Sequence, residues 1–139
     1  MIEQTSQGLQ LPELLLVEPD SVIRGTVAGV CKQLNLAIVH QAASINVAEN
    51  TANPRSMDCM LVSLSEGNLA FRFLERVRTG EWGSSSEIPL AVTSDHANDD
   101  LIVRVKALAV KRLLLQPYKI KDVVKTIETL RQERQEDAS

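Results

Sequence analysis

Aromatic residues and cysteines are scarce in this sequence. Phenylalanine, tryptophan and tyrosine together make up 3% of the 139 residues, which is too few for a base-stacking platform or a ring-lined sugar site. The 2 cysteines, Cys31 and Cys59, cannot form the multi-bridge framework of a small disulfide-rich protein. We expect both to be small buried hydrophobic residues in a reducing compartment.

Export and membrane-insertion signals are also missing. Residues 1–10 have neither the basic segment nor the apolar core of a signal peptide. No apolar run approaches the roughly 20 residues that span a bilayer. The formal net charge of −3 gives no overall attraction to nucleic acid or to an anionic membrane. The sequence therefore predicts a cytoplasmic protein without membrane association.

Short, largely apolar segments recur along the chain, at residues 14–17, 37–40, 59–62, 89–92 and 113–115. Apolar runs without alternation are typical of strands that are buried on both faces, as in a parallel sheet. Between them, apolar residues recur with helical spacing, as at Ile23, Val27 and Cys31. We predict helices that end near residues 35, 50, 78, 108 and 130.

Strand and helix therefore alternate five times. This order predicts an α/β fold: a flavodoxin-like (βα)5 doubly wound sandwich, whose five-stranded parallel sheet has the order 2-1-3-4-5. We predict one domain at residues 13–131, a flexible N-terminal segment at 1–12 and a frayed C-terminal tail at 132–139. In such folds the functional crevice lies at the carboxyl ends of the strands.

Four segments at these strand ends resemble the receiver domains of two-component response regulators, the CheY-like family. They read LLLVEPDSVIR, MDCMLVSLS, IPLAVTSD and LLLQPYKIKDVVKTI, and the resemblance covers the chain from about Leu14 to Leu130. It implies an acidic turn that binds magnesium, a phosphorylated aspartate ending the third strand, a switch threonine at Thr93, and a Lys-Pro pair ending the fifth strand.

The chain departs from the family at the positions that carry the chemistry. Ser63 stands where the family has the phosphorylated aspartate, and Gln116 stands where it has the lysine. Pro19 follows Glu18 in place of the second acidic residue, and Leu113 replaces the aromatic residue that rotates on activation. Phosphoryl transfer needs a carboxylate nucleophile, a divalent cation and a cationic contact. We therefore expect magnesium binding to be weak or absent, no other cofactor, and no enzymatic activity. Because no phosphoryl group would draw the Thr93 hydroxyl inward, we expect it to hydrogen-bond within its loop.

Two displaced carboxylates could rescue phosphorylation. Asp20 lies next to the acidic turn, and Glu66 lies three residues after Ser63. Asp58 precedes Ser63 by five residues, which places it at the opposite end of the strand. His40 and His96 are too isolated to indicate a metal site or a general base. We predict His40 at a strand end and His96 in the loop that opens the fourth helix.

Basic residues gather in the C-terminal third of the chain. Residues 101–125 contain seven basic residues and a single acidic residue, Asp122. The bases that we assign to a partner-binding surface are Arg104, Lys106, Lys111, Arg112, Lys119 and Lys121. They belong to the fourth helix, the fifth strand and the fifth helix, which form the usual partner or dimer surface of the family that the chain resembles. The surface is either a dock for an acidic protein partner or a solvated face. Nucleic-acid binding there ranks third, because no recognition motif accompanies it.

Three hypotheses follow. The first is a receiver-like module of a phosphorelay that acts by contact with a histidine kinase, an output domain or another regulator. The second is a working phospho-acceptor that uses Glu66 or Asp20. The third is a structural dimerisation domain of a larger regulator, in which the fourth helix, fifth strand and fifth helix form a homodimer face.

Overall fold

Five parallel strands form the centre of the computed structural model, which describes residues 10–138, with side chains described to residue 133. The strands are β1 (Glu13–Val17), β2 (Ile38–Ala42), β3 (Cys59–Ser63), β4 (Leu90–Ser94) and β5 (Arg112–Leu115). Their order in the sheet is β2-β1-β3-β4-β5, and every pairing is parallel. Both the flavodoxin-like fold and the strand order 2-1-3-4-5 are therefore confirmed.

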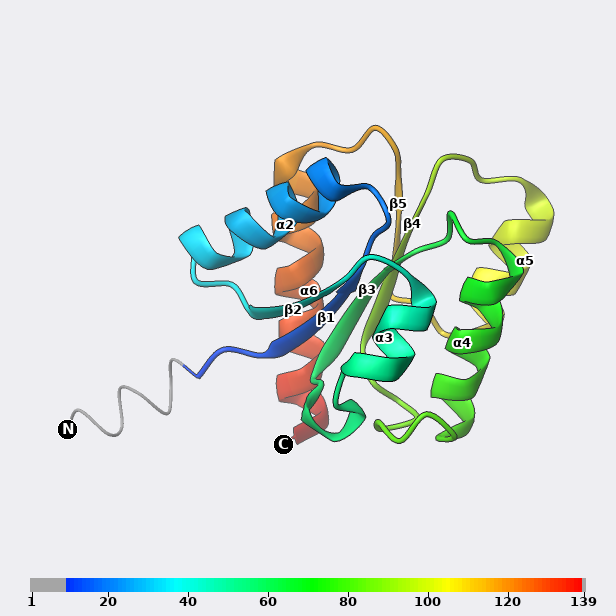
Figure 1. The fold of residues 1–139 in the computed structure, drawn as a ribbon, viewed down its shortest axis with the longest axis horizontal. Coiled ribbons are helices and arrows are strands. Elements are labelled where there is room, and N and C mark those ends of the chain that lie inside the picture. Colours follow the sequence, from blue (N-terminus) through cyan, green and yellow to red (C-terminus); the bar gives the residue numbers. More distant parts are fainter. Residues whose placement is uncertain (1–9, 139) are drawn as a thin grey trace.

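Helices cover both faces of this sheet (Figure 1). They are α2 (Ser21–Gln33), α3 (Ile45–Thr51), the short 3-10 helix η1 (Pro54–Ser56), α4 (Asn68–Thr79), α5 (Asp99–Ala107) and α6 (Ile120–Ala138). Side chains of α2 and α6 share one apolar cluster with alternate residues of the strands, and those of α3, α4 and α5 share the other. Every residue of β3 and β4 is buried, as the unbroken apolar runs predict.

Short polar side chains cap the N-termini of α2, α3 and α5. The Asp20 carboxylate accepts hydrogen bonds from the amides at the start of α2, and Ser44 and Asn98 cap α3 and α5 in the same way. Such N-caps stabilise a helix by about 1 kcal/mol each, because they satisfy amides that have no partner within the helix. Gly80 ends α4 at φ 84°, a left-handed conformation that favours glycine.

Several boundaries differ from the predicted ones. Helix α6 continues to Ala138, past the end near residue 130 and through most of the segment predicted to fray. Residues 131–138 are rich in Arg, Gln and Glu, whose helix propensity prolongs a helix without an apolar stripe. His40 lies in the middle of β2 and not at a strand end, because β2 extends to Ala42. Of the predicted flexible segment 1–12, residues 1–9 lie outside the described residues.

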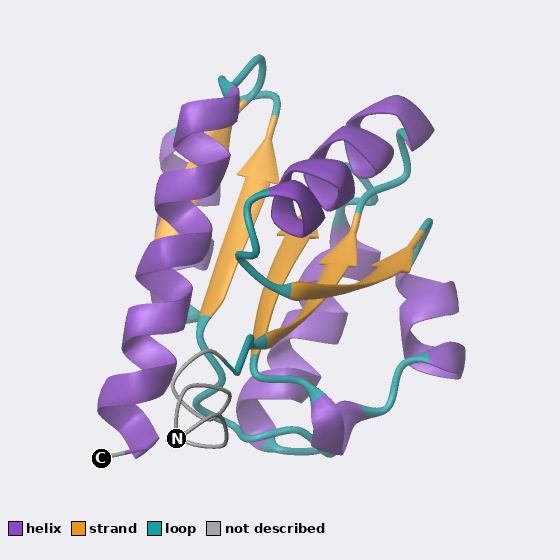
Figure 2. Ribbon diagram, turned by 90° about the vertical axis from the view of Figure 1, so that its left-hand side faces the viewer, coloured by secondary structure: helices purple, strands orange, loops and turns teal. Residues whose placement is uncertain are grey.

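The parallel strands bring five loops to one edge of the sheet. The arrowheads in Figure 2 point toward this carboxyl edge, where the loops after β1, β3, β4 and β5 meet. The edge carries all of the residues that the sequence assigns to the degenerate phosphorylation pocket. Among residues 10–138, no helix combines the length and the apolar character needed to cross a membrane.

Candidate functional site

Four of the predicted pocket residues share one face of the sheet at its carboxyl edge. Ser63 pairs in register with Thr93 as the last residue of β3, and their side chains point to the α2–α6 face. Glu18 extends β1 by one residue, since its amide donates to the carbonyl of Ala42 (3.0 Å). Gln116 extends β5, since its amide donates to the carbonyl of Ser94 (2.8 Å). The side-chain alternation along a strand therefore brings Glu18, Ser63, Thr93 and Gln116 together.

The hydroxyl of Ser63, the last residue of β3, makes hydrogen bonds within its own turn. The Ser63 side chain is 2% exposed, and its Oγ donates to Oγ of Ser65 (2.9 Å). The same oxygen accepts a hydrogen bond from the Ser65 amide (3.2 Å). No base contacts this hydroxyl among the described residues. Ser63 is thus a turn-forming residue at the end of β3, where the resemblance to receiver domains predicts the phosphorylated aspartate.

Glu18 and Asp20 are the two acids of the turn after β1, and both accept backbone hydrogen bonds. The Glu18 side chain is 4% exposed, and its Oε2 accepts from the Asp20 amide (2.9 Å). Oδ1 of Asp20 accepts from the amides of Val22 (2.9 Å) and Ile23 (3.0 Å), which makes Asp20 the N-cap of α2. Pro19, between them, is exposed. The carboxylate of Asp20 is therefore directed to the helix and not to Ser63.

Glu66, the other displaced carboxylate, serves a different helix. Its Oε2 accepts a hydrogen bond from the amide of Ile45 at the start of α3 (2.8 Å). This contact joins the loop after β3 to α3, on the sheet face opposite to Ser63. Asp20 and Glu66, the two carboxylates predicted as alternative acceptors, thus both accept hydrogen bonds from backbone amides at helix starts.

The side chains at this edge do not supply the oxygen ligands that magnesium usually binds. Magnesium binds through near-octahedral oxygen ligands that usually include one or two carboxylates. Here Glu18 is the single buried carboxylate among the described residues, at the same edge of the sheet as the hydroxyls of Ser63 and Thr93. Among the described residues, no group of three or more His, Cys, Asp or Glu side chains is placed to hold a metal ion. The residues present therefore do not fit the cation of an active receiver.

Thr93 differs from its prediction. Its side chain is 2% exposed, and its Oγ1 has no hydrogen-bond partner among the described residues. The expectation that this hydroxyl bonds within the loop is therefore wrong. The neighbouring residue takes that role instead, because Oγ of Ser94 donates to the carbonyl of His96 (2.8 Å). His96 lies in the loop before α5, as predicted, and its Nδ1 is 2.8 Å from Oδ1 of Asp95.

Tyr118 is a site residue that sequence reasoning did not select. Burial, together with the nearby charges of Glu18 and Asp20, raises the pKa of Tyr118 to about 12. Burial likewise raises the pKa of Glu18, and the Asp20 amide and Arg24 oppose that rise in part. The phenol thus stays protonated beside the acidic turn at neutral pH. Its position directly after Gln116-Pro117 was the available signal.

The raised pKa of Glu18 predicts a stability change on replacement by glutamine. The folded chain binds a proton at Glu18 more tightly than the unfolded chain, so stability falls as pH rises above the ordinary pKa of 4.5. Glutamine keeps the acceptor for the Asp20 amide but carries no charge to bury. Glu18→Gln should be more stable than the wild type at pH 7, with a difference that shrinks as the pH falls toward 4.5.

Urea unfolding followed by circular dichroism at several pH values measures this difference. The comparison between the two chains cancels the titration of all other groups. A Glu18→Gln protein that is less stable than the wild type at pH 7 would contradict the assignment of Glu18 as a buried, destabilised carboxylate.

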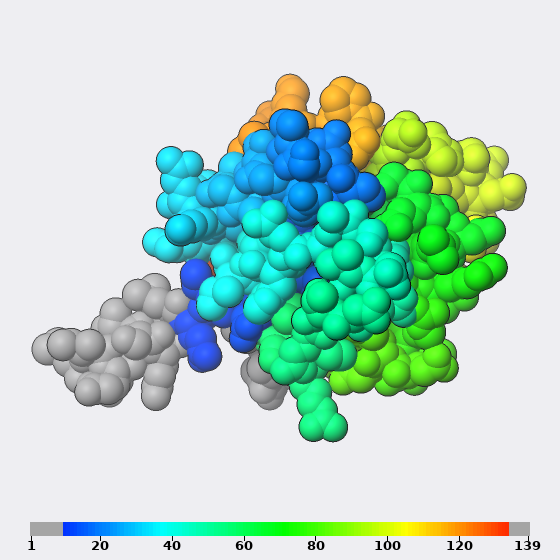
Figure 3. All heavy atoms as spheres, viewed as in Figure 1, coloured from blue at the N-terminus to red at the C-terminus, as the bar shows by residue number. Residues whose placement is uncertain are grey.

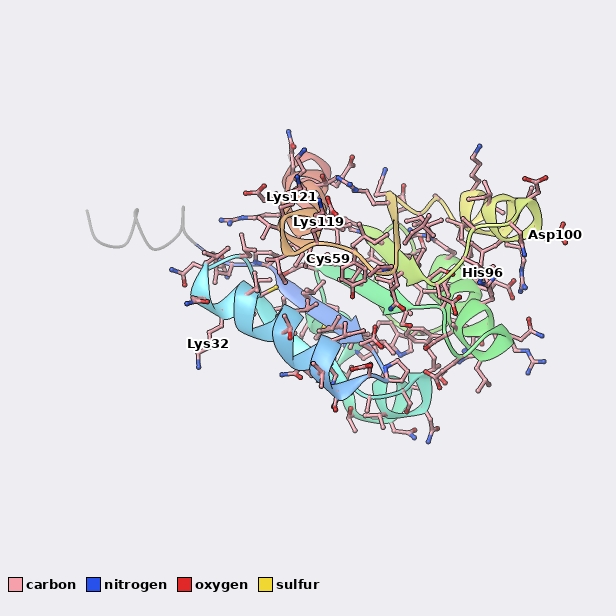
Figure 4. The ribbon with its side chains drawn as sticks, turned by 90° about the horizontal axis from the view of Figure 1, so that it is seen from above. Lys32, Cys59, His96, Asp100, Lys119 and Lys121 are labelled. Carbon is pink, nitrogen blue, oxygen red and sulfur yellow. The ribbon has the colours of Figure 1, made fainter. Side chains whose placement is uncertain are left out.

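Two bases of the predicted surface, Arg104 and Lys111, make contacts within the chain. The Arg104 guanidinium stacks on the ring of Phe71 in α4 at 3.7 Å, and Nζ of Lys111 lies 3.5 Å from Oε2 of Glu133. Lys119 and Lys121 lie together at the start of α6 (Figure 4). The other four bases of the predicted surface lie on α5 and at the start of β5.

No protein-family model and no curated protein matches the sequence. The solved structures that match include response-regulator receiver domains, so the chain has the fold of a receiver domain. One is the signal receiver domain of a putative LuxO repressor protein from Vibrio parahaemolyticus, with a TM-score of 0.78, 12% identity, and coverage of 93% of this chain and 96% of that chain.

Two other receiver structures also match over most of their length. The non-phosphorylated HemR receiver domain from Leptospira biflexa has a TM-score of 0.75 and 23% identity, and the match covers 86% of this chain and 93% of that chain. The chemotaxis protein CheY4 from Vibrio cholerae has a TM-score of 0.75 and 18% identity, with 87% and 99% covered. Similarity at this level of identity establishes the fold.

Proposed function

We propose that the chain is a receiver-like signalling module of a two-component system that works by protein contact and not through aspartyl phosphate. The observation that carries this proposal is the end of β3, where the buried hydroxyl of Ser63 bonds Ser65 in a turn. The receiver fold of the structural neighbours supports the signalling role. We also place the protein in the cytoplasm, where such relays operate.

This edge lacks the three groups that phosphoryl transfer to a receiver requires. The nucleophile position holds a hydroxyl without a base, the second acidic position holds Pro19, and the cationic position holds Gln116. Asp20 and Glu66 remain the alternative acceptors, but each accepts backbone hydrogen bonds at a helix start. Those bonds hold each carboxylate at the start of a helix.

Without aspartyl phosphate, the module needs another ligand to select or change its conformation. A ligand shifts a conformational equilibrium only when it binds the two states with different affinity. Without a phosphoryl group, a protein partner is the ligand that can discriminate between states. We therefore propose one resident conformation that partner binding either recognises or changes.

The partner surface that we propose consists of α5, β5 and α6. Each element exposes one apolar side chain: Val103 (66%), Leu115 (48%) and Ile120 (44%). The exposed lysines Lys106, Lys119 and Lys121 lie on or beside the same elements and have no ion pair among the described residues. Apolar anchors with a cationic rim fit an acidic segment of a histidine kinase, an output domain or another regulator.

Nuclear magnetic resonance with a phosphoryl mimic tests this proposal. Magnesium and beryllofluoride are added to the 15N-labelled wild-type chain, and amide shifts are followed to millimolar ligand. We expect no saturable change at Ser63, Thr93 or Gln116, because a carboxylate nucleophile and a second acidic ligand are both missing. Saturable shifts that centre on these residues would favour the working phospho-acceptor instead.

A further inference from the structure

Strand β2 is the outer strand at one side of the sheet, and no strand of the described residues pairs with its outer edge. The Ile38 amide donates to the carbonyl of Pro12 (2.9 Å), which fixes the face that β2 presents to β1. Alternation along the strand then directs the N–H and C=O groups of Val39 and Gln41 away from β1. No hydrogen bond of these four groups occurs within the described residues. The edge is a template for another strand.

Hollows flank this edge on both sides. A hollow of about 520 Å³ lies between α2 and β2 and is lined in part by Gly25, Gly29, Ile38 and Val39. A second hollow of about 300 Å³ lies on the α3 side, beside His40. The cyan part of the chain, which includes β2, lies at the outer surface of the molecule (Figure 3). Side chains from an added strand would alternate between the two hollows.

Apolar side chains and small residues surround the same edge. Leu34 is 54% exposed, Ile38 is 50% exposed, and both lie at the ends of the connection between α2 and β2. A Cβ atom added at Gly25 or Gly29 would meet nothing within 4 Å, so the outer side of α2 is open. Two glycines inside a helix cost roughly 1 kcal/mol each relative to alanine. They also leave room for a second helix to approach closely.

We propose that this edge pairs with β2 of a second copy of the chain, antiparallel about a twofold axis at His40. The backbone groups of Val39 then meet those of Gln41 of the partner subunit, and the reverse, so that each pair exchanges two N–H···O bonds. The two sheets join into one, and the two α2 helices come to lie on the same side of it.

The pattern of β2 favours a second copy over another occupant. The outward-facing residues Val39 and Gln41 lie symmetrically about His40, so a twofold axis matches every donor with an acceptor. Residues 38–42 contain no Lys, Arg, Asp or Glu, so two copies bring no permanent like charges together. Nε2 of each His40 lies 2.8 Å from Oε1 of Glu13, so each imidazole has a hydrogen-bond partner in its own chain.

Amide exchange of the full-length wild-type chain tests the pairing directly. In dilute solution the amides of Val39 and Gln41 should exchange quickly, while those of Ile38, His40 and Ala42 are protected by β1. At high concentration the amides of Val39 and Gln41 should slow at least tenfold, and light scattering should report the mass of two chains.

Proline at position 41 provides a matched variant. Gln41→Pro removes an outward N–H but no bond to β1, so we expect a folded chain that stays monomeric at every concentration. Gln41→Ala keeps the N–H and should dimerise like the wild type. Leu115→Glu changes the α5–β5–α6 surface and should leave the dimer intact.

Four results would overturn the proposal. They are a wild type that stays monomeric up to millimolar concentration, a dimer in which the amides of Val39 and Gln41 still exchange quickly, a Gln41→Pro chain that dimerises, and a dimer that Leu115→Glu abolishes. The exchange pattern is read from the wild type, so the test does not depend on the folding of any variant.

Discussion

Replacing Arg78 with methionine is expected to destabilise the protein by about 3 kcal/mol. The guanidinium of Arg78, in the last turn of α4, donates to the carbonyls of Leu108 (2.7 Å) and Ile88 (2.7 Å). It also reaches the carbonyls of Ser86 (3.1 Å) and Ala109 (3.3 Å). One side chain thus joins α4 to the segment before β4 and to the end of α5. Methionine keeps the aliphatic volume but leaves these acceptors without their charged donor.

Arg72 provides the control for this experiment. It lies on the same helix, is exposed and has no hydrogen bond or ion pair among the described residues. Arg72→Met should change stability by less than about 0.5 kcal/mol. Urea unfolding of both variants measures the difference, and equal stability of Arg78→Met and Arg72→Met would show that the four carbonyl contacts contribute nothing.

A triple replacement at the carboxyl edge is expected to create a phospho-acceptor. Ser63→Asp supplies the carboxylate nucleophile at the end of β3, and Pro19→Asp adds a second acidic ligand beside Glu18. Gln116→Lys adds the cationic contact for the phosphoryl oxygens. After incubation with acetyl phosphate and magnesium, intact-mass measurement should show one base-labile phosphoryl group on most chains.

The matched control replaces Ser63 with asparagine in the same background. Asparagine has the shape of aspartate but is not a nucleophile, so the Ser63→Asn, Pro19→Asp, Gln116→Lys chain should stay unmodified. If the aspartate version keeps its native circular dichroism and also stays unmodified, the loss of phosphorylation has a cause beyond these three positions. The altered loop after Ser63 would then be the next candidate.

The sequence predicted the fold because its signals were local and repeated. Unbroken apolar runs such as Leu14–Val17 and Cys59–Val62 mark strands that are buried on both faces, and helices follow each of them. The residue spacing also placed Glu18, Ser63, Thr93 and Gln116 at one edge, because parallel strands end on the same side. Those placements needed only the order of the elements.

Contacts between distant segments could not be predicted in this way. Arg78 on α4 binds backbone carbonyls up to 31 residues away, and no local pattern reveals such acceptors. The same is true of Glu66, whose bond to the Ile45 amide spans 21 residues. Thr93 was expected to find a partner in its own loop, but Ser94 takes the nearby acceptor. Side-chain pairing at the edge depends on loop geometry that the sequence alone does not specify.

Intact-mass measurement of the wild-type chain after treatment with acetyl phosphate and magnesium tests the central claim most directly. A hydroxyl without a base at the end of β3 predicts an unchanged mass at every time point. A stoichiometric, base-labile phosphoryl adduct on the wild-type protein would contradict that account, and mapping it to Asp20 or Glu66 would identify the carboxylate that accepts the group.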